Sequence, residues 1–206
     1  AGGPGRYELK LMAGQSNDAG IVEVWNSPKK AMVQVVPSGG WKITDMQVYI
    51  GTEPVPTRQG NPVPGKFPFK YEFEQPVPLH TAVADLSEDL DFSWGKSPRV
   101  QIVAVHVDLV QLDDTGKKIA EEGAWAQGPF LFEGSQWGWW TTYELAHPRR
   151  GHFIDAPVVG LSYRGPTQQG VTSDVEGDGG FLFFPGEEIE FSVGIVVLGT
   201  AEAAKK

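Results

Sequence analysis

Aromatic and apolar side chains recur at every second position between Trp137 and Leu145, where the sequence reads WGWWTTYEL. Successive side chains of a β-strand point to opposite faces, so this spacing places Trp137, Trp139, Thr141, Tyr143 and Leu145 on one face. Large rings at alternate positions are typical of a strand that has one face buried against another layer. The segment therefore predicts a strand whose tryptophan-bearing face packs into a core.

The same alternation recurs along most of the chain. Arg99–Leu112 is the longest example, and both of its faces are rather apolar, which favours a central place in a sheet. Residues 52–66 hold four prolines and cannot form a central strand, because proline lacks the backbone donor. Only Thr81–Phe92 offers a helical turn. The pattern predicts an all-β protein, an antiparallel β-sandwich with a second, smaller β module.

The segment FPFKYEFE follows the proline-rich stretch and alternates as well. Phe67, Phe69, Tyr71 and Phe73 are expected to share one face of a strand. Pro68 suggests that this strand lies at a sheet edge, where a missing donor is tolerated.

A change of composition at His147, in the sequence HPRRGH, suggests a division of the chain. We expect a large β-sandwich domain at residues 1–148, a linker at 149–154 and a small β module at 155–206. The last part is close to the lower size limit for independent folding. It is therefore expected to pack on the first domain or to be a truncated piece of a longer module.

Charge and composition argue against several classes of protein. The formal net charge of −9 disfavours nucleic acid as a partner, because nucleic-acid binding needs a basic face. No run of eighteen apolar residues occurs, so we expect no membrane insertion. Cysteine is absent, which excludes disulfides and thiolate metal sites within this sequence.

Several segments resemble a domain of uncharacterised bacterial secreted and cell-surface proteins. They occur in order over about residues 8–145 and read LMAGQ, GWKITDMQVYIG, GNPVPGKFPF, VAVHVDLV and AWAQGPFLFEGSQWGWWTTYEL. The stretch at about residues 156–199, which begins APVVGLSYRG, is similar to a small β module of bacterial surface lipoproteins. The resemblance implies export and a β fold, and it implies no activity.

Tryptophans suggest one kind of binding site. Exposed, coplanar rings stack on sugars, while polar neighbours bind the hydroxyl groups. Trp140 is the first candidate, because it lies on the face opposite Trp137 and Trp139, and Trp125 and Trp94 are next. The alternative is that all of these rings are core residues.

Carboxylates suggest calcium. Asp174, Glu176 and Asp178 stand at alternate positions, as oxygen ligands do in a Ca²⁺ loop. The EF-hand pattern fails, however, because Pro185 stands where a bidentate Glu belongs, so a Gly-rich turn is the alternative. A second acidic group, which could equally be a solvated surface, comprises Asp85, Glu88, Asp89 and Asp91.

Histidines suggest a transition metal. His106 and Asp108 lie on one face of the Arg99–Leu112 strand, and His80 could join them as a second imidazole ligand for copper or zinc. A buried histidine with satisfied hydrogen bonds is the alternative.

An enzyme is the least favoured class. LMAGQSNDAG is similar to the block around the nucleophilic serine of SGNH-type carbohydrate esterases, which would make Ser16 the nucleophile. That chemistry needs a D-x-x-H segment, and no aspartate stands three residues before any of the four histidines. A turn stabilised by local side-chain hydrogen bonds is the alternative.

We therefore expect a non-enzymatic, exported protein at the cell surface or outside the cell, with a structural or adhesive role. Its partners would be other copies of itself or envelope proteins, and glycans are a further option. It could be a subunit of an extracellular filament or other assembly. The alternative is a non-catalytic binding module for carbohydrate or for a metal ion, calcium or copper.

Overall fold

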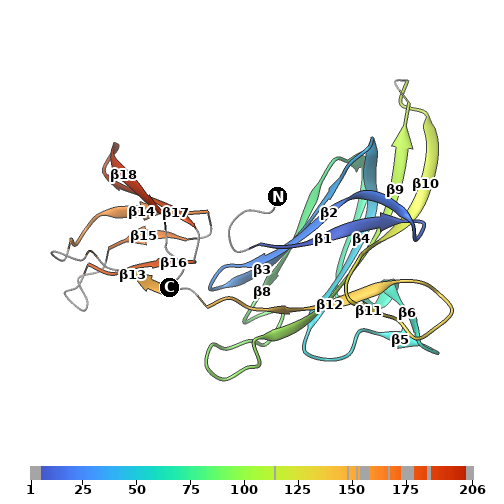
Figure 1. The fold of residues 1–206 in the computed structure, drawn as a ribbon, viewed down its shortest axis with the longest axis horizontal. Coiled ribbons are helices and arrows are strands. Elements are labelled where there is room, and N and C mark those ends of the chain that lie inside the picture. Colours follow the sequence, from blue (N-terminus) through green and yellow to red (C-terminus); the bar gives the residue numbers. More distant parts are fainter. Residues whose placement is uncertain are drawn as a thin grey trace. The chain divides into compact units, whose positions relative to one another are not determined.

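The computed structural model describes residues 6–113, 115–147, 149–151, 153, 158–166, 168–172, 179–184 and 187–202. The chain forms two compact units (Figure 1). The first comprises Tyr7–Trp25 and Lys29–Leu145, and the second is built mainly from the described residues after Leu145. The predicted fold class, antiparallel all-β with a second, smaller β module, is confirmed.

The first unit is one large antiparallel sheet that curls until it is nearly closed into a barrel. Its path runs in the order β11-β12-β9-β10-β1-β2-β3-β8. Strands β12 and β10 pair with the two ends of one edge of β9. Strand β4 pairs with the other edge of β9, and β7 pairs with β4. Its strands are β1 (Tyr7–Ala13), β2 (Asn17–Asn26), β3 (Lys30–Pro37), β4 (Trp41–Gly51), β7 (Phe69–Val77), β8 (His80–Asp85), β9 (Val100–Leu112), β10 (Lys118–Ala126), β11 (Phe130–Leu131) and β12 (Trp139–Glu144).

The proline-rich segment forms a small structure of its own. It holds the two-stranded hairpin of β5 (Thr57–Arg58) and β6 (Asn61–Pro62), followed by a 3-10 turn, η1 (Pro64–Lys66). Pro64 stands at the start of this turn, where its missing N–H costs nothing. The segment stays outside the large sheet, as its prolines require.

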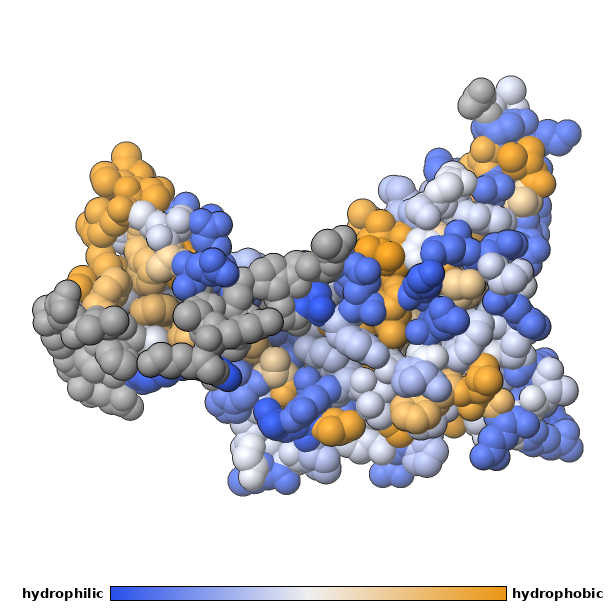
Figure 2. All heavy atoms as spheres, in the orientation of Figure 1, coloured by the Kyte–Doolittle hydropathy of each residue, from blue (hydrophilic) through white to orange (hydrophobic). Residues whose placement is uncertain are grey.

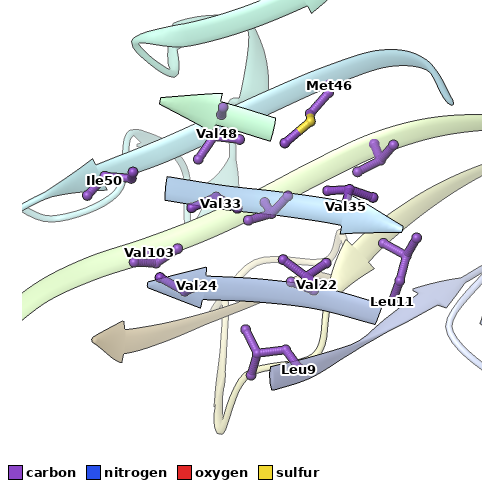
Figure 3. Packing of buried hydrophobic residues seen from close by; sticks show 14 of the residues in the cluster. Leu9, Leu11, Val22, Val24, Val33, Val35, Met46, Val48, Ile50 and Val103 are labelled. Atoms are coloured by element: carbon purple, nitrogen blue, oxygen red, sulfur yellow. The ribbon is translucent and has the colours of Figure 1, made fainter. Parts of the chain in front are cut away.

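The interior of the curled sheet is mainly aliphatic (Figure 3). Strand β9 contributes Val103, Val105, Val107 and Leu109, each at most 1% exposed. Their even spacing puts all four on the inner face, and β1 to β4 supply similar rows. Burying an aliphatic side chain of this size contributes about 1.5–3 kcal/mol, so this core is the main source of the unit's stability.

The second unit contains a four-stranded and a two-stranded antiparallel sheet. The larger has the order β15-β14-β17-β18, and the smaller pairs β13 with β16. Their bounds are β13 (Arg149–Gly151), β14 (Ser162–Arg164), β15 (Gln169–Val171), β16 (Phe181–Phe183), β17 (Glu188–Val193) and β18 (Val196–Glu202).

A core of Leu161, Tyr163, Ile189 and Phe191 holds the second unit together. Part of the segment expected to be a linker belongs to this unit instead, since Arg149–Gly151 pairs with Phe181–Phe183. The backbone groups of this basic tripeptide find partners in a neighbouring strand, which a solvent-exposed linker would not offer.

Candidate ligand site on the outer face of the first unit

A second hydrophobic cluster lies on the outer face of the large sheet. The alternate residues of β9 that do not face the interior include Ala104 and His106, and β10 presents Trp125 on the same side. The buried members of this outer cluster are Tyr49, Val55, Phe67, Ala104 and Trp125, with Ile102, Phe132, Trp137, Trp139 and Trp140 packed against them. Most of the chain's tryptophans therefore gather outside the barrel rather than within it.

Two loops join above this outer cluster. The Gly134 N–H donates a hydrogen bond to the Gly60 carbonyl at 2.9 Å, and the Gln136 N–H donates to Asn61 Oδ1 at 2.7 Å. Glycine is required at the crossing, because a Cβ on Gly134 would lie 2.2 Å from Asn61 Oδ1. The junction fixes the hairpin of residues 57–62 to the loop of residues 132–138 and leaves a pocket on either side.

The first pocket, of about 400 Å³, contains Trp140. Its walls are mostly apolar, with Thr57 and Glu133 as the polar side chains. One face of the Trp140 ring is covered, because Phe130 stacks on it at a centroid distance of 4.3 Å. Trp140 thus forms part of a pocket wall instead of a free, flat platform.

The second pocket, of about 580 Å³, contains His106. Its lining combines rings with hydrogen-bonding groups and comprises Gly14, Pro62, Pro64, His106, Glu122, Gly123, Trp125, Ser135, Gln136 and Trp137. This volume lies in the usual range of small-ligand sites. We refer to it below as the His106 pocket.

His106 is held in one tautomer by its neighbour on β4. Its Nδ1 lies 2.6 Å from Gln47 Oε1, and an amide oxygen can only accept, so Nδ1 carries the proton. Burial lowers the pKa of His106, and the nearby Asp108 carboxylate opposes this effect in part. The ring is therefore neutral at pH 7, and its Nε2 is a hydrogen-bond acceptor.

The three tryptophans proposed for sugar binding do not form one platform: Trp140 and Trp125 belong to the outer cluster but line different pockets, and Trp94 lies elsewhere. Trp125 is 4% exposed and packs edge-on against Phe67 and His106, so it forms pocket floor rather than an exposed platform. Trp94 packs edge-on against Phe92, beside the barrel core instead of the outer cluster.

The two histidines proposed as metal ligands lie on opposite faces of the large sheet. His80 is directly opposite Val35, which faces the barrel interior, whereas His106 lies in the outer cluster beside Trp125. Strand alternation decides this, because every second residue of a strand faces the interior and the others face outward. His80 stands at an inward position of β8, and His106 stands at an outward position of β9. The proposed copper or zinc pair of His80 and His106 therefore cannot form.

His80 occupies the seam where the barrel stays open, between β7 and β8. Its ring contacts Tyr71 and Phe73 at centroid distances of 4.3 and 4.9 Å. Its Nε2 is buried and has no hydrogen-bond partner among the described residues. Burial lowers the pKa of His80, because the apolar seam favours the neutral ring.

Replacing His80 with phenylalanine should raise the stability of the first unit by about 1 kcal/mol, because it removes an unsatisfied buried nitrogen. Wild-type stability should also fall below about pH 6.5, where the unfolded ring takes up a proton that the folded ring resists. The advantage of His80→Phe should therefore grow between about pH 8 and pH 5. Urea unfolding at several pH values measures both effects. Both proteins keep His106, so its contribution to the pH dependence of stability cancels when they are compared. A variant less stable than wild type at every pH would contradict this account.

The remaining acidic candidates have mostly structural roles. Asp108 Oδ1 lies 4.0 Å from His106 Nε2, too far for a hydrogen bond. Asp85 Oδ1 accepts hydrogen bonds from the backbone of Ser87 and Glu88, which lower the Asp85 pKa and shape the turn after β8. The helical turn expected within Thr81–Phe92 is this single turn after β8, in which the Asp89 N–H donates to the Asp85 carbonyl at 3.0 Å.

Asp174, Glu176 and Asp178 lie outside the described residues. Elsewhere in the described chain, no cluster of three or more His, Asp or Glu side chains is placed to hold a metal ion. The described residues also contain no helix long and apolar enough to cross a membrane. Ser16 lies in the turn that joins β1 to β2, and at the start of β2 Asp18 Oδ1 accepts from the Gly20 N–H at 3.3 Å.

Sequence reasoning missed the contributions of Gln47, Glu122 and Gln136. No local pattern marks them, since strand register brings Gln47 to His106 and the loop junction brings Gln136 over the sheet. Comparison with known proteins adds no candidates: no family model, curated protein or solved structure matches this chain significantly.

Proposed function

We propose that the chain is a self-associating structural or adhesive protein of the cell surface, and that two copies pair through strand β18 of the second unit. The observation that supports this is the exposure of β18. All seven residues of Val196–Glu202 are exposed, and β17 is the only described strand that pairs with β18. An exposed, apolar sheet edge is an open template for another strand.

The apolar surface extends around the β17–β18 hairpin (Figure 2). Ile195 at its tip is fully exposed, and the exposed fractions of Val193, Val196, Val197 and Leu198 are 54–59%. Contiguous patches of this kind are typical of protein–protein contacts. Natural proteins usually protect sheet edges with lysine, proline or β-bulges. Neither lysine nor proline occurs in Val193–Glu202, and the single bulge, at Leu198, leaves every residue of β18 exposed.

A second copy of the chain fits this edge better than a charged partner. No charged residue occurs between Val193 and Ala201, so the net charge of −9 is not concentrated where the copies would meet. An antiparallel pairing centred on Gly199 places Glu202 of one copy opposite Val196 of the other. The two Glu202 side chains then lie at opposite ends, and the contact is symmetric, as in most homodimers.

Leu198→Lys tests this pairing. Leu198 is the extra residue of a bulge next to Gly199, so in the proposed pairing both Leu198 side chains lie near the centre of the contact and two lysines would repel each other. We expect wild-type protein to shift from monomer to dimer over about a hundredfold range of concentration, and Leu198→Lys to stay monomeric. Light scattering coupled to gel filtration measures this. The control is Ile119→Lys in β10, which alters a similarly exposed side chain and the same net charge.

A mixing experiment distinguishes pairing from a general change in solubility. Leu198→Glu should also be monomeric alone, whereas an equimolar mixture with Leu198→Lys should form a heterodimer. A wild-type protein that stays monomeric throughout, or a mixture that does not associate, would refute the pairing. Export, the other part of this proposal, is tested by fractionation of the native cells.

A further inference from the structure

We infer that the His106 pocket of the first unit is a second, independent binding site, and that its ligand is a neutral sugar ring. The site is separate from the β18 edge, which belongs to the other unit. The mixture of residues that line the pocket and the charges that surround it support this ligand class.

The pocket offers both kinds of contact that a sugar needs. Trp137 is partly exposed and supplies apolar ring surface for the C–H face of a pyranose, while the nearly buried Trp125 forms part of the pocket floor. Ser135, Gln136 and Glu122 supply side chains that can bind hydroxyl groups. A wholly apolar ligand would leave these polar groups without partners, which costs binding energy.

His106 adds an acceptor at a defined position. Gln47 accepts the Nδ1 proton, so Nε2 is left to accept a hydroxyl of the ligand. Gly123, directly opposite Asp108 on the neighbouring strand, keeps the space beside this nitrogen open. A Cβ at Gly123 would lie 3.5 Å from His106 Nε2, so any larger side chain there would occupy the space.

The charges around the pocket disfavour an anionic ligand. Glu122 lines the pocket, Asp108 lies next to His106, and Asp45 is directly opposite Asp108 on β4. A phosphate or an acidic sugar would meet these carboxylates. A neutral ring that donates hydroxyl protons to carboxylate, amide and imidazole acceptors is the better match.

Native gel electrophoresis through soluble polysaccharides tests the site on the full chain. Suitable probes are β-glucan, xylan, galactomannan and glycol chitin. We expect at least one of them to retard the wild-type protein, and His106→Ala and Gln136→Ala each to weaken the retardation about tenfold. Gln136→Ala keeps the fold, because the Gln136 side chain is exposed and the bond to Asn61 uses the backbone N–H.

Two further variants make the result specific to this pocket. Gly123→Val should abolish retardation by filling the pocket while His106 stays in place. Glu133→Ala, on the same loop but in the wall of the Trp140 pocket, should bind as wild type does.

The inference is overturned if no probe retards the wild-type protein, or if Gly123→Val is retarded as strongly as wild type. Tetramethylammonium serves as a second probe, by calorimetry. Binding of this cation without any polysaccharide would assign the pocket to an organic cation and refute the sugar. Running every gel with Leu198→Lys as well separates this result from self-association through β18.

Discussion

Replacing Phe67 with alanine should destabilise the first unit by about 3–5 kcal/mol, the usual cost of removing a fully buried phenyl ring. Phe67 is completely buried at the centre of the outer cluster, where its ring meets Tyr49 at 5.9 Å and Trp125 at 6.3 Å. Its loss leaves a cavity beneath the proline-rich segment. We therefore expect the floor of the His106 pocket to loosen together with the fold.

Tryptophan fluorescence during urea unfolding measures this effect in the first unit alone, because all seven tryptophans precede residue 146. Phe130→Ala is a matched control, since the same ring is removed from a residue that is 42% exposed. It should cost less than half as much. Equal losses at the two positions would show that the outer cluster is not a core.

Replacing Gly20 with alanine should have an effect of similar size, about 3 kcal/mol or more. Gly20 has a φ of 139°, which L-residues rarely adopt, and a Cβ there would lie 2.3 Å from the Val36 carbonyl oxygen. The atoms in the way belong to the backbone of the adjoining segment, so no side chain can rotate to relieve the clash. Strand β2 would have to move away from the end of β3.

Substitution of the turn glycine Gly116 shows how much of the effect at Gly20 comes from backbone strain and how much from the steric clash. It has a φ of 81°, but a Cβ there meets no atom within 4 Å. Gly116→Ala should therefore cost only the strain, about 1 kcal/mol. The same fluorescence measurement compares the two variants, and a Gly20→Ala loss no larger than that of Gly116→Ala would exclude the clash as the cause.

The strand alternation of β9 could be predicted from sequence because it depends on local geometry. Side chains of Val103 to Leu109 alternate in the sequence, and a strand puts every second one on the same face. The prolines of residues 52–66 likewise excluded a central strand without any tertiary information. Both predictions are properties of a single segment and its backbone.

The same reasoning misplaced Phe67 and the tryptophans. Phe67 was expected to share a face with Phe69, Tyr71 and Phe73, but those three pack against the barrel core whereas Phe67 enters the outer cluster. Strand β7 begins only at Phe69, so the alternation does not extend back across Pro68. Trp139 similarly joins the outer cluster, although Thr141 and Tyr143 are buried as expected.

The sequence by itself determined the all-β class, the central character of β9 and the exclusion of the proline-rich segment from the sheet, because backbone geometry and donor count act over a few residues. Only the tertiary structure decided that two cores lie on opposite faces of one sheet, that His80 and His106 are separated, and that Gln47, Gly123 and Gln136 gather around His106. These relations depend on register between strands far apart in the chain and on the junction of two loops. No local sequence pattern indicates the strand register or the junction of the loops.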